Sequence, residues 1–69
     1  MSMRTLTTVH ATHDLRRGRT LVRRGQPGRV VGSFPNWSST TYSVEFTTDD
    51  DPAVVVTFSG LTERDVQPD

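Results

Sequence analysis

The chain has 69 residues, and its eight arginines balance eight acidic residues, so the formal net charge at pH 7 is zero. A chain of this length holds one small domain, whose apolar core only narrowly outweighs the entropy cost of ordering the backbone. It contains no cysteine, which excludes a disulfide framework, a thiolate zinc site and a cysteine nucleophile.

The chain begins with a predicted strand that leads into a basic loop. Residues 5–15 (TLTTVHATHDL) direct Val9 and Ala11 inward, with Leu15 at the end of the strand. Residues 16–29 follow with six arginines and no acid. We expect five of these arginines on a long exposed loop between the first two strands, and Arg29 at the start of the second strand.

The turn signal GQPG, residues 25–28, separates this loop from the second predicted strand. Residues 28–34 (GRVVGSF) place Val30, Gly32 and Phe34 on one face by their alternation. A glycine inside a strand indicates a bend or a close approach of another backbone.

Two strands joined by a polar loop are the clearest feature of the second half. Residues 41–47 (TYSVEFT) alternate apolar and polar side chains, and residues 53–59 (AVVVTFS) are β-branched and aromatic. Residues 48–52 (TDDDP) have the chemistry of a hairpin loop, and their aspartates act as gatekeeper charges against aggregation. The sequence therefore predicts an antiparallel hairpin.

Residues 61–66 (LTERDV) predict a short 3-10 turn before a last strand. Five short strands separated by turn chemistry predict an all-β fold, a small five-stranded barrel. We expect one domain over residues 1–69, with residues 1–5 and 68–69 frayed. The predicted core consists of Val9, Ala11, Leu15, Leu21, Val30, Val44, Phe46, Val54, Val56, Phe58, Leu61 and Val66.

The order of these elements resembles the SH3-like barrels of small bacterial domains, including KOW-type relatives and single-domain proteins of unknown role. The resemblance covers roughly residues 6–68 and depends on order and spacing. It implies that the glycine turn at residues 25–28 precedes the second strand and that LTERDV is the helical turn before the last strand. The aromatic cluster that lines a groove for proline-rich peptides is missing, so the resemblance does not extend to that activity.

The uneven distribution of charge makes the arginine segment the candidate binding surface. Residues 1–29 carry seven arginines against one acid, and residues 30–69 carry one arginine against seven acids. The planar guanidinium group binds carboxylate and phosphate in a two-pronged geometry. Trp37, in a polar loop, either adds an apolar anchor for a partner or folds back over the mouth of the barrel. The candidate partner-binding residues are Arg16, Arg17, Arg19, Arg23, Arg24, Arg29 and Trp37.

Three functions are consistent with this surface. The leading hypothesis is a non-enzymatic protein-interaction or accessory module that docks on an acidic protein partner or a larger complex. The alternative is a nucleic-acid-binding accessory domain that places the same arginines on phosphates and Trp37 on a base. A pI of about 6.7 is far from that of dedicated nucleic-acid binders. The third is an enzyme subunit that stabilises a complex without chemistry of its own.

The sequence lacks the motifs of catalysis and of metal binding. It has no phosphate-binding loop ending in Gly-Lys, no nucleophile elbow and no His-Glu-x-x-His. A barrel this small is filled by its own side chains, so we expect no cavity for a small-molecule substrate and no cofactor. His10 and His13 cannot complete a metal shell, and the consecutive aspartates lack calcium-loop spacing. We expect both histidines at the surface or at a strand edge.

No apolar run in the sequence is long enough to span a bilayer, and the first fifteen residues lack the apolar core of a signal peptide. The predicted location is therefore the cytoplasm.

Overall fold

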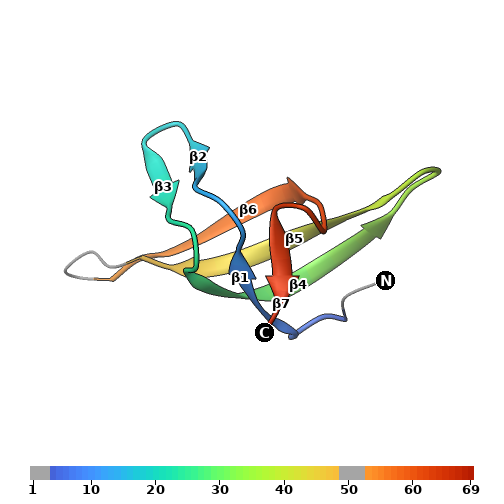
Figure 1. The fold of residues 1–69 in the computed structure, drawn as a ribbon, viewed down its shortest axis with the longest axis horizontal. Helices are drawn as coiled ribbons and strands as arrows, with labels where there is room; N and C mark the ends of the chain where they lie inside the picture. Colours follow the sequence, from blue (N-terminus) through green and yellow to red (C-terminus); the bar gives the residue numbers. More distant parts are fainter. Residues whose placement is uncertain (1–3, 49–52) are drawn as a thin grey trace.

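Residues 4–48 and 53–69 are described by a computed structural model, and they form an all-β fold (Figure 1). The strands are β1 (Thr8–Ala11), β2 (Leu15–Arg17), β3 (Thr20–Val22), β4 (Pro27–Pro35), β5 (Thr40–Thr47), β6 (Val55–Leu61) and β7 (Val66–Pro68). A five-stranded antiparallel sheet has the order β6-β5-β4-β1-β7, and β2 pairs with β3 in a separate hairpin. None of the described residues is helical, so that part of the chain holds no helix that could cross a membrane.

The first and last strands lie side by side in the five-stranded sheet. Val9 of β1 pairs with Pro68 of β7, and Ala11 pairs with Val66. The Asp69 amide then donates a hydrogen bond of 3.1 Å to the Thr8 carbonyl. Of residues 68–69, which the sequence predicts to fray, Pro68 is thus paired with Val9 and Asp69 is hydrogen-bonded to β1.

The all-β prediction is confirmed, and the predicted strands correspond to β1, β4, β5, β6 and β7. The predicted basic loop is wrong, because it contains the β2–β3 hairpin. Leu15 pairs with Val22 across this hairpin, and both side chains are buried. Pairing lets the two apolar side chains reach the core from one face while their neighbours stay in water.

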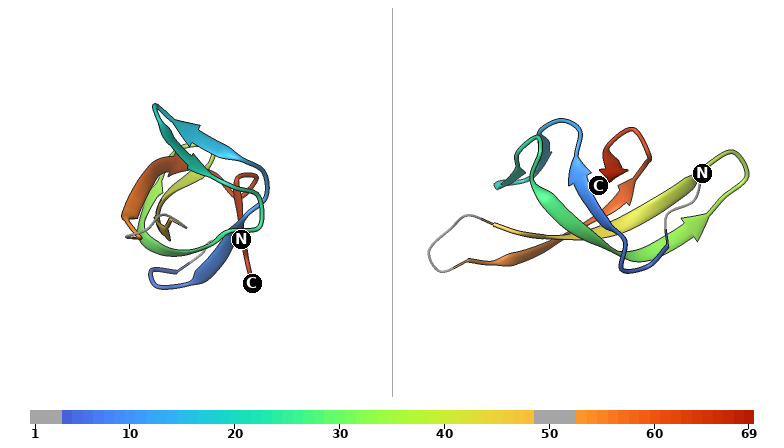
Figure 2. Two further views of the ribbon diagram at one scale, coloured as in Figure 1. Left: turned by 90° about the vertical axis from the view of Figure 1, so that its left-hand side faces the viewer. Right: turned by 60° about the horizontal axis from the view of Figure 1, so that its bottom comes forward.

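The described sheet does not close as the sequence predicts, and a hydrogen-bonded turn precedes β7 at the position where a short 3-10 turn is predicted. The edge strands β6 and β7 are not paired with each other, so the described residues form a curled sheet and no closed barrel (Figure 2). Before β7, the Thr62 carbonyl accepts hydrogen bonds from the amides of Asp65, at 2.9 Å, and Val66, at 3.3 Å. These bonds form a single turn without a helix.

Two irregularities bend the sheet on either side of β5. In β4, the pairing register with β5 shifts between Val30 and Gly32. In β6, the register with β5 shifts between Phe58 and Leu61, where Gly60 has a φ of +74°. Bulges of this kind bend a strand and increase its twist. The extra residue in β4 also reverses the alternation, so Val30 is buried but Phe34 is 57% exposed. The prediction that these two side chains share a face is therefore wrong.

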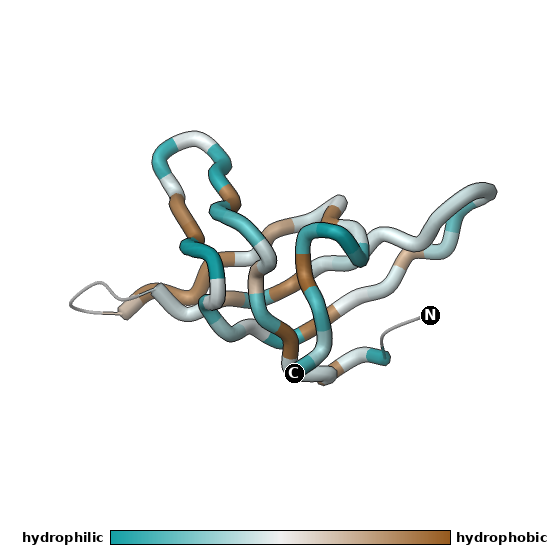
Figure 3. The backbone as a smooth tube through the Cα atoms, viewed as in Figure 1, coloured by the Kyte–Doolittle hydropathy of each residue, from teal (hydrophilic) through white to brown (hydrophobic). Residues whose placement is uncertain are grey.

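The core lies within the curled sheet and beneath the hairpin, where the hydrophobic residues concentrate (Figure 3). The ring centroids of Phe46 and Phe58 lie 5.9 Å apart and the ring planes are perpendicular, which is a favoured geometry for aromatic pairs. Tyr42 is fully buried although the predicted core omits it, and Val54, which the prediction includes, is 48% exposed. The buried apolar residues are Val9, Ala11, Leu15, Val22, Val30, Tyr42, Val44, Phe46, Phe58, Leu61 and Val66, with Val56 partly buried against them. Leu21 was also predicted to be buried, but Val22 takes that place and Leu21 is only half-buried.

A glycine in β4 allows Phe46 to pack across the strand. Gly28 and Phe46 are paired, and a Cβ atom on Gly28 would lie 2.7 Å from two ring carbons of Phe46 and 2.9 Å from the Glu45 carbonyl oxygen. A Cβ atom on Gly32, in the same strand, would lie 3.2 Å from the exposed ring of Phe34. The first position has no room for a methyl group, whereas at the second the exposed ring can rotate away.

We predict that Gly28→Ala lowers the free energy of unfolding by about 1–3 kcal/mol, because Phe46 must leave its packed rotamer. Gly32→Ala serves as the control and should change it by less than about 0.5 kcal/mol. Urea denaturation of both variants measures the difference. Equal decreases in the free energy of unfolding for the two variants would show that the contact with Phe46 does not determine the effect of Gly28→Ala.

Candidate functional site

The arginines of the predicted binding segment lie on and around the β2–β3 hairpin. They are Arg16 and Arg17 in β2, Arg19 in the hairpin turn, Arg23 and Arg24 after β3, and Arg29 in β4. All six side chains are exposed, and within residues 4–48 and 53–69 none of them forms an ion pair with an acid. Clustered positive charge without compensation attracts anionic groups.

Arg17 differs from the other arginines because its guanidinium group contacts the sheet. Its Nη2 donates a hydrogen bond of 2.8 Å to the Ser59 carbonyl, and the group lies 5.4 Å from the centre of the Phe58 ring. Both partners belong to β6, an edge strand of the sheet. Arg17 therefore fastens the hairpin to the sheet and occupies a carbonyl that another strand would otherwise pair with.

Trp37 lies in the turn between β4 and β5, at one end of the long axis of the molecule and away from the β2–β3 hairpin, which projects from the side of the sheet (Figure 1, Figure 2). The turn is closed by a 2.8 Å hydrogen bond from the Asn36 amide to the Ser39 carbonyl. The Trp37 side chain is fully exposed and does not fold back over the core. The structure thus separates Trp37 from the arginines of residues 16–24. Arg29 lies apart from the hairpin in β4, where it is paired with Glu45 of β5.

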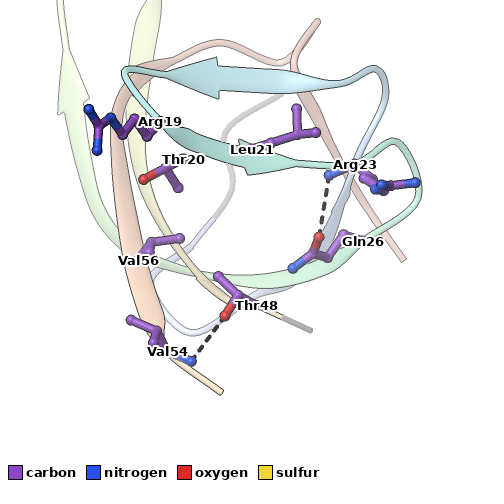
Figure 4. Close-up of a pocket in the computed structure, with 8 residues that line it drawn as sticks. All are labelled: Arg19, Thr20, Leu21, Arg23, Gln26, Thr48, Val54 and Val56. Carbon is purple, nitrogen blue, oxygen red and sulfur yellow. Dashed lines mark hydrogen bonds between the residues drawn. The ribbon is translucent and has the colours of Figure 1, made fainter. Parts of the chain in front are cut away.

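A hollow of about 540 Å³ separates the hairpin from the adjoining ends of β5 and β6 (Figure 4). Its lining residues are Arg19, Thr20, Leu21, Arg23, Gln26, Thr48, Val54 and Val56. Arg19 and Arg23 lie toward opposite ends, and valines from β6 and the residues before it form the facing wall. This hollow lies at the surface, outside the core. Sequence reasoning missed it because the hairpin that forms one wall was not predicted.

Hydrogen bonds fix the walls of the hollow. The Gln26 side chain donates to the Thr47 carbonyl at 2.6 Å, and its oxygen accepts the Arg23 amide at 3.3 Å. On the facing wall, the Thr48 amide donates to the Val54 carbonyl at 2.8 Å, and the Thr48 hydroxyl accepts the Val54 amide at 3.0 Å. The backbone on both sides is therefore held in place before any ligand arrives.

Two histidine–aspartate pairs join the N-terminal strand to the C-terminal segment. Nδ1 of His10 lies 2.8 Å from Oδ1 of Asp69, and Nε2 of His13 lies 2.8 Å from Oδ1 of Asp65. The other ring nitrogen of His13 lies 3.0 Å from the Asp14 carbonyl oxygen. Since a carbonyl and a carboxylate are both acceptors, His13 satisfies the two bonds only as the imidazolium.

The electrostatics of the second pair agree with this assignment. The hydrogen bond to Asp65, followed by that to the Asp14 carbonyl, raises the pKa of His13 above 6.5. Burial pushes the pKa of Asp65 upward, but hydrogen bonds from Thr62 and His13 outweigh burial and lower it below 3.8. Among the described residues, no three His, Asp or Glu side chains gather as a metal ion requires. The histidines therefore act here as partners of single carboxylates.

No protein-family model matches the chain, and comparisons with curated proteins and with solved structures likewise find no match.

We predict that Arg17→Ala lowers the free energy of unfolding by about 1–2 kcal/mol, because it removes a charged hydrogen bond and a cation–π contact. Arg16→Ala, the neighbouring exposed position, should change it by less than about 0.5 kcal/mol. Thermal and urea denaturation measure both variants. If the two substitutions cost the same, Arg17 does not fasten the hairpin.

We predict that the His13–Asp65 pair makes stability depend on pH at both ends of a window. Since the folded pKa of His13 is raised, its contribution is present below pH 6.5 and is lost as the pH rises through the raised value. Since the pKa of Asp65 is lowered, its contribution is present above pH 3.8 and is lost on further acidification. Urea denaturation of wild type and His13→Gln across this range should show the largest difference inside the window. A His13 ring that titrates at or below 6.5 by NMR would contradict the pairing.

Proposed function

We propose that this chain is a non-enzymatic interaction module that docks on an acidic protein partner or larger complex through its arginine hairpin. The arginine hairpin is defined here as Arg16, Arg19, Arg23 and Arg24. The observation that carries the proposal is the presentation of these exposed guanidinium groups, without acidic partners among the described residues, on an element that Arg17 fastens to the sheet. A fixed cluster of arginines matches carboxylate groups with little loss of entropy on binding.

An SH3-like barrel is the fold relationship that we propose for the module. The adjacent first and last strands, the bend in β4 at its glycine and the turn at residues 62–66 before β7 support it. The hairpin then corresponds to an elaborated connection between the first two strands of the barrel.

Phe34 near the end of β4 and Trp37 in the turn that follows are both exposed, and we propose this second surface as an apolar anchor for the same partner. Large aromatic side chains are costly to leave in water and are enriched at the centres of interfaces. Because this surface lies at the far end of the molecule, a partner that uses both surfaces must extend along its length.

The separation of Trp37 from the arginine hairpin also favours a protein over a nucleic acid as the partner. Binding of single-stranded nucleic acid combines basic side chains with an adjacent aromatic ring on which a base stacks. Here the exposed tryptophan is remote from the arginine hairpin. Nucleic-acid binding therefore remains the second candidate, supported by the arginines alone.

Co-purification from the source cells with quantitative mass spectrometry tests the proposal. We predict that Arg23→Glu/Arg24→Glu lowers the recovery of the wild-type partners by about tenfold or more, because paired charges become repulsive. Arg4→Glu/Arg64→Glu makes the same change in net charge outside the hairpin, and this variant should still recover the partners. Trp37→Ala should reduce recovery without changing the salt dependence. Equal recovery with both double variants would contradict docking through the hairpin.

A labelled single-stranded oligonucleotide distinguishes the second candidate. Phosphate binding requires the logarithm of the affinity to fall steeply with the logarithm of the salt concentration. An absence of binding at low salt removes nucleic acid as the partner.

A further inference from the structure

Strand β3 and the residues that flank it form one wall of the hollow. Arg19 in the hairpin turn, Leu21 in β3 and Arg23 after β3 are at alternate positions in the sequence, and all three line the hollow together with Thr20. Val22, between them, is buried in the core. Val22 therefore points into the core, while its neighbours Leu21 and Arg23 line the hollow.

The facing wall is aliphatic. Val56 is partly buried, and Val54 is half-exposed, so apolar surface remains in contact with water opposite Leu21. No aromatic side chain lines the hollow, so it offers no ring on which a nucleic-acid base could stack. Its volume falls within the range of about 300–1,000 Å³ that is typical of ligand sites.

The spacing of the arginines sets the length of a complementary ligand. Residues 20–22 are extended, and with a rise of about 3.3 Å per residue the Cα atoms of Arg19 and Arg23, which flank them, lie at most about 13 Å apart. An extended peptide has the same rise, so two acids four positions apart match the two guanidinium groups. The residue midway between them points to the same side as both acids and meets Leu21, Val54 and Val56.

We infer that this hollow binds an extended segment of a protein partner with the pattern acid-x-aliphatic-x-acid. The inference rests on the proposed function and names the chemistry of the partner. The carboxylates pair with Arg19 and Arg23, and the central aliphatic side chain covers the apolar wall. The Gln26 side chain joins Arg23 to Thr47, and Thr48 is hydrogen-bonded to Val54 within the facing wall, so the site is formed before the peptide binds. Residues 49–52, on which the predicted hairpin loop falls, lie outside the described part of the chain.

NMR titration with three peptides at low salt tests the pattern. The matching probe is acetyl-Gly-Glu-Ser-Leu-Ser-Glu-Gly-amide. A spacing control of the same composition, acetyl-Gly-Ser-Glu-Leu-Glu-Ser-Gly-amide, brings the acids next to the leucine. An apolar control replaces the leucine of the matching probe with serine. The matching probe should bind about fivefold more tightly than either control and should shift the methyl signals of Leu21 and Val56.

Two variants locate the binding. Arg19→Gln/Arg23→Gln should weaken the matching probe by about fivefold, because both ion pairs are lost. Arg4→Gln/Arg64→Gln removes the same net charge away from the hollow and should leave the affinity within about twofold. Retained amide spectra show that both variants are folded.

The outcomes distinguish this inference from the proposed function. Equal binding of the matching probe and the spacing control shows that the hairpin attracts acids by charge alone, which overturns the inference but leaves the docking proposal intact. Absence of binding by the matching probe overturns the inference, and the co-purification result then decides the docking proposal independently. Tighter binding of a thymidine oligonucleotide of equal charge, lost in Arg19→Gln/Arg23→Gln, shows that the hollow takes phosphate and also overturns it.

Discussion

The packing of the β2–β3 hairpin against β6 is the contact on which the rest of the structure depends. Leu15 and Val22 point from the hairpin into the core, and Arg17 adds its hydrogen bond to Ser59 and its contact with the Phe58 ring. This packing covers the open side of a sheet whose edge strands do not pair with each other. It also leaves the other face of the hairpin exposed to solvent. The same short hairpin therefore contributes side chains both to the core and to a charged surface.

The second constraint joins the two ends of the described chain. His10 and His13 contact aspartates of the C-terminal segment, and Thr12 donates from its amide to the Asp65 carbonyl and from its hydroxyl to the Arg64 carbonyl. These bonds place the acids of the second half of the sequence beside the histidines of the first half. They do not reach the arginine hairpin, where the Asp14 carboxylate accepts the Arg24 backbone amide and the guanidinium groups form no ion pair among the described residues.

The sequence was sufficient for the strands in which apolar and polar residues alternate over several positions, because alternation directly reports a half-buried strand. It was insufficient for β2 and β3, which have three residues each and carry arginines between Leu15 and Val22. The missed signal was Gly18, which takes a φ of +60° in the two-residue turn between the paired Arg17 and Thr20. The hollow could not be predicted, because its walls join segments far apart in the chain. The separation of the tryptophan from the arginines could not be predicted either, since it depends on how far β4 and β5 extend beyond their bend.

The most direct test of this account is the nuclear Overhauser spectrum of the protein in solution. Fastening of the hairpin predicts cross-peaks between the Arg17 side chain and the Phe58 ring, and backbone order parameters over residues 15–22 like those of the central sheet. An absence of these cross-peaks, together with order parameters below about 0.6 over the same residues, would mean that the hairpin moves independently and that neither the charged surface nor the hollow is preformed.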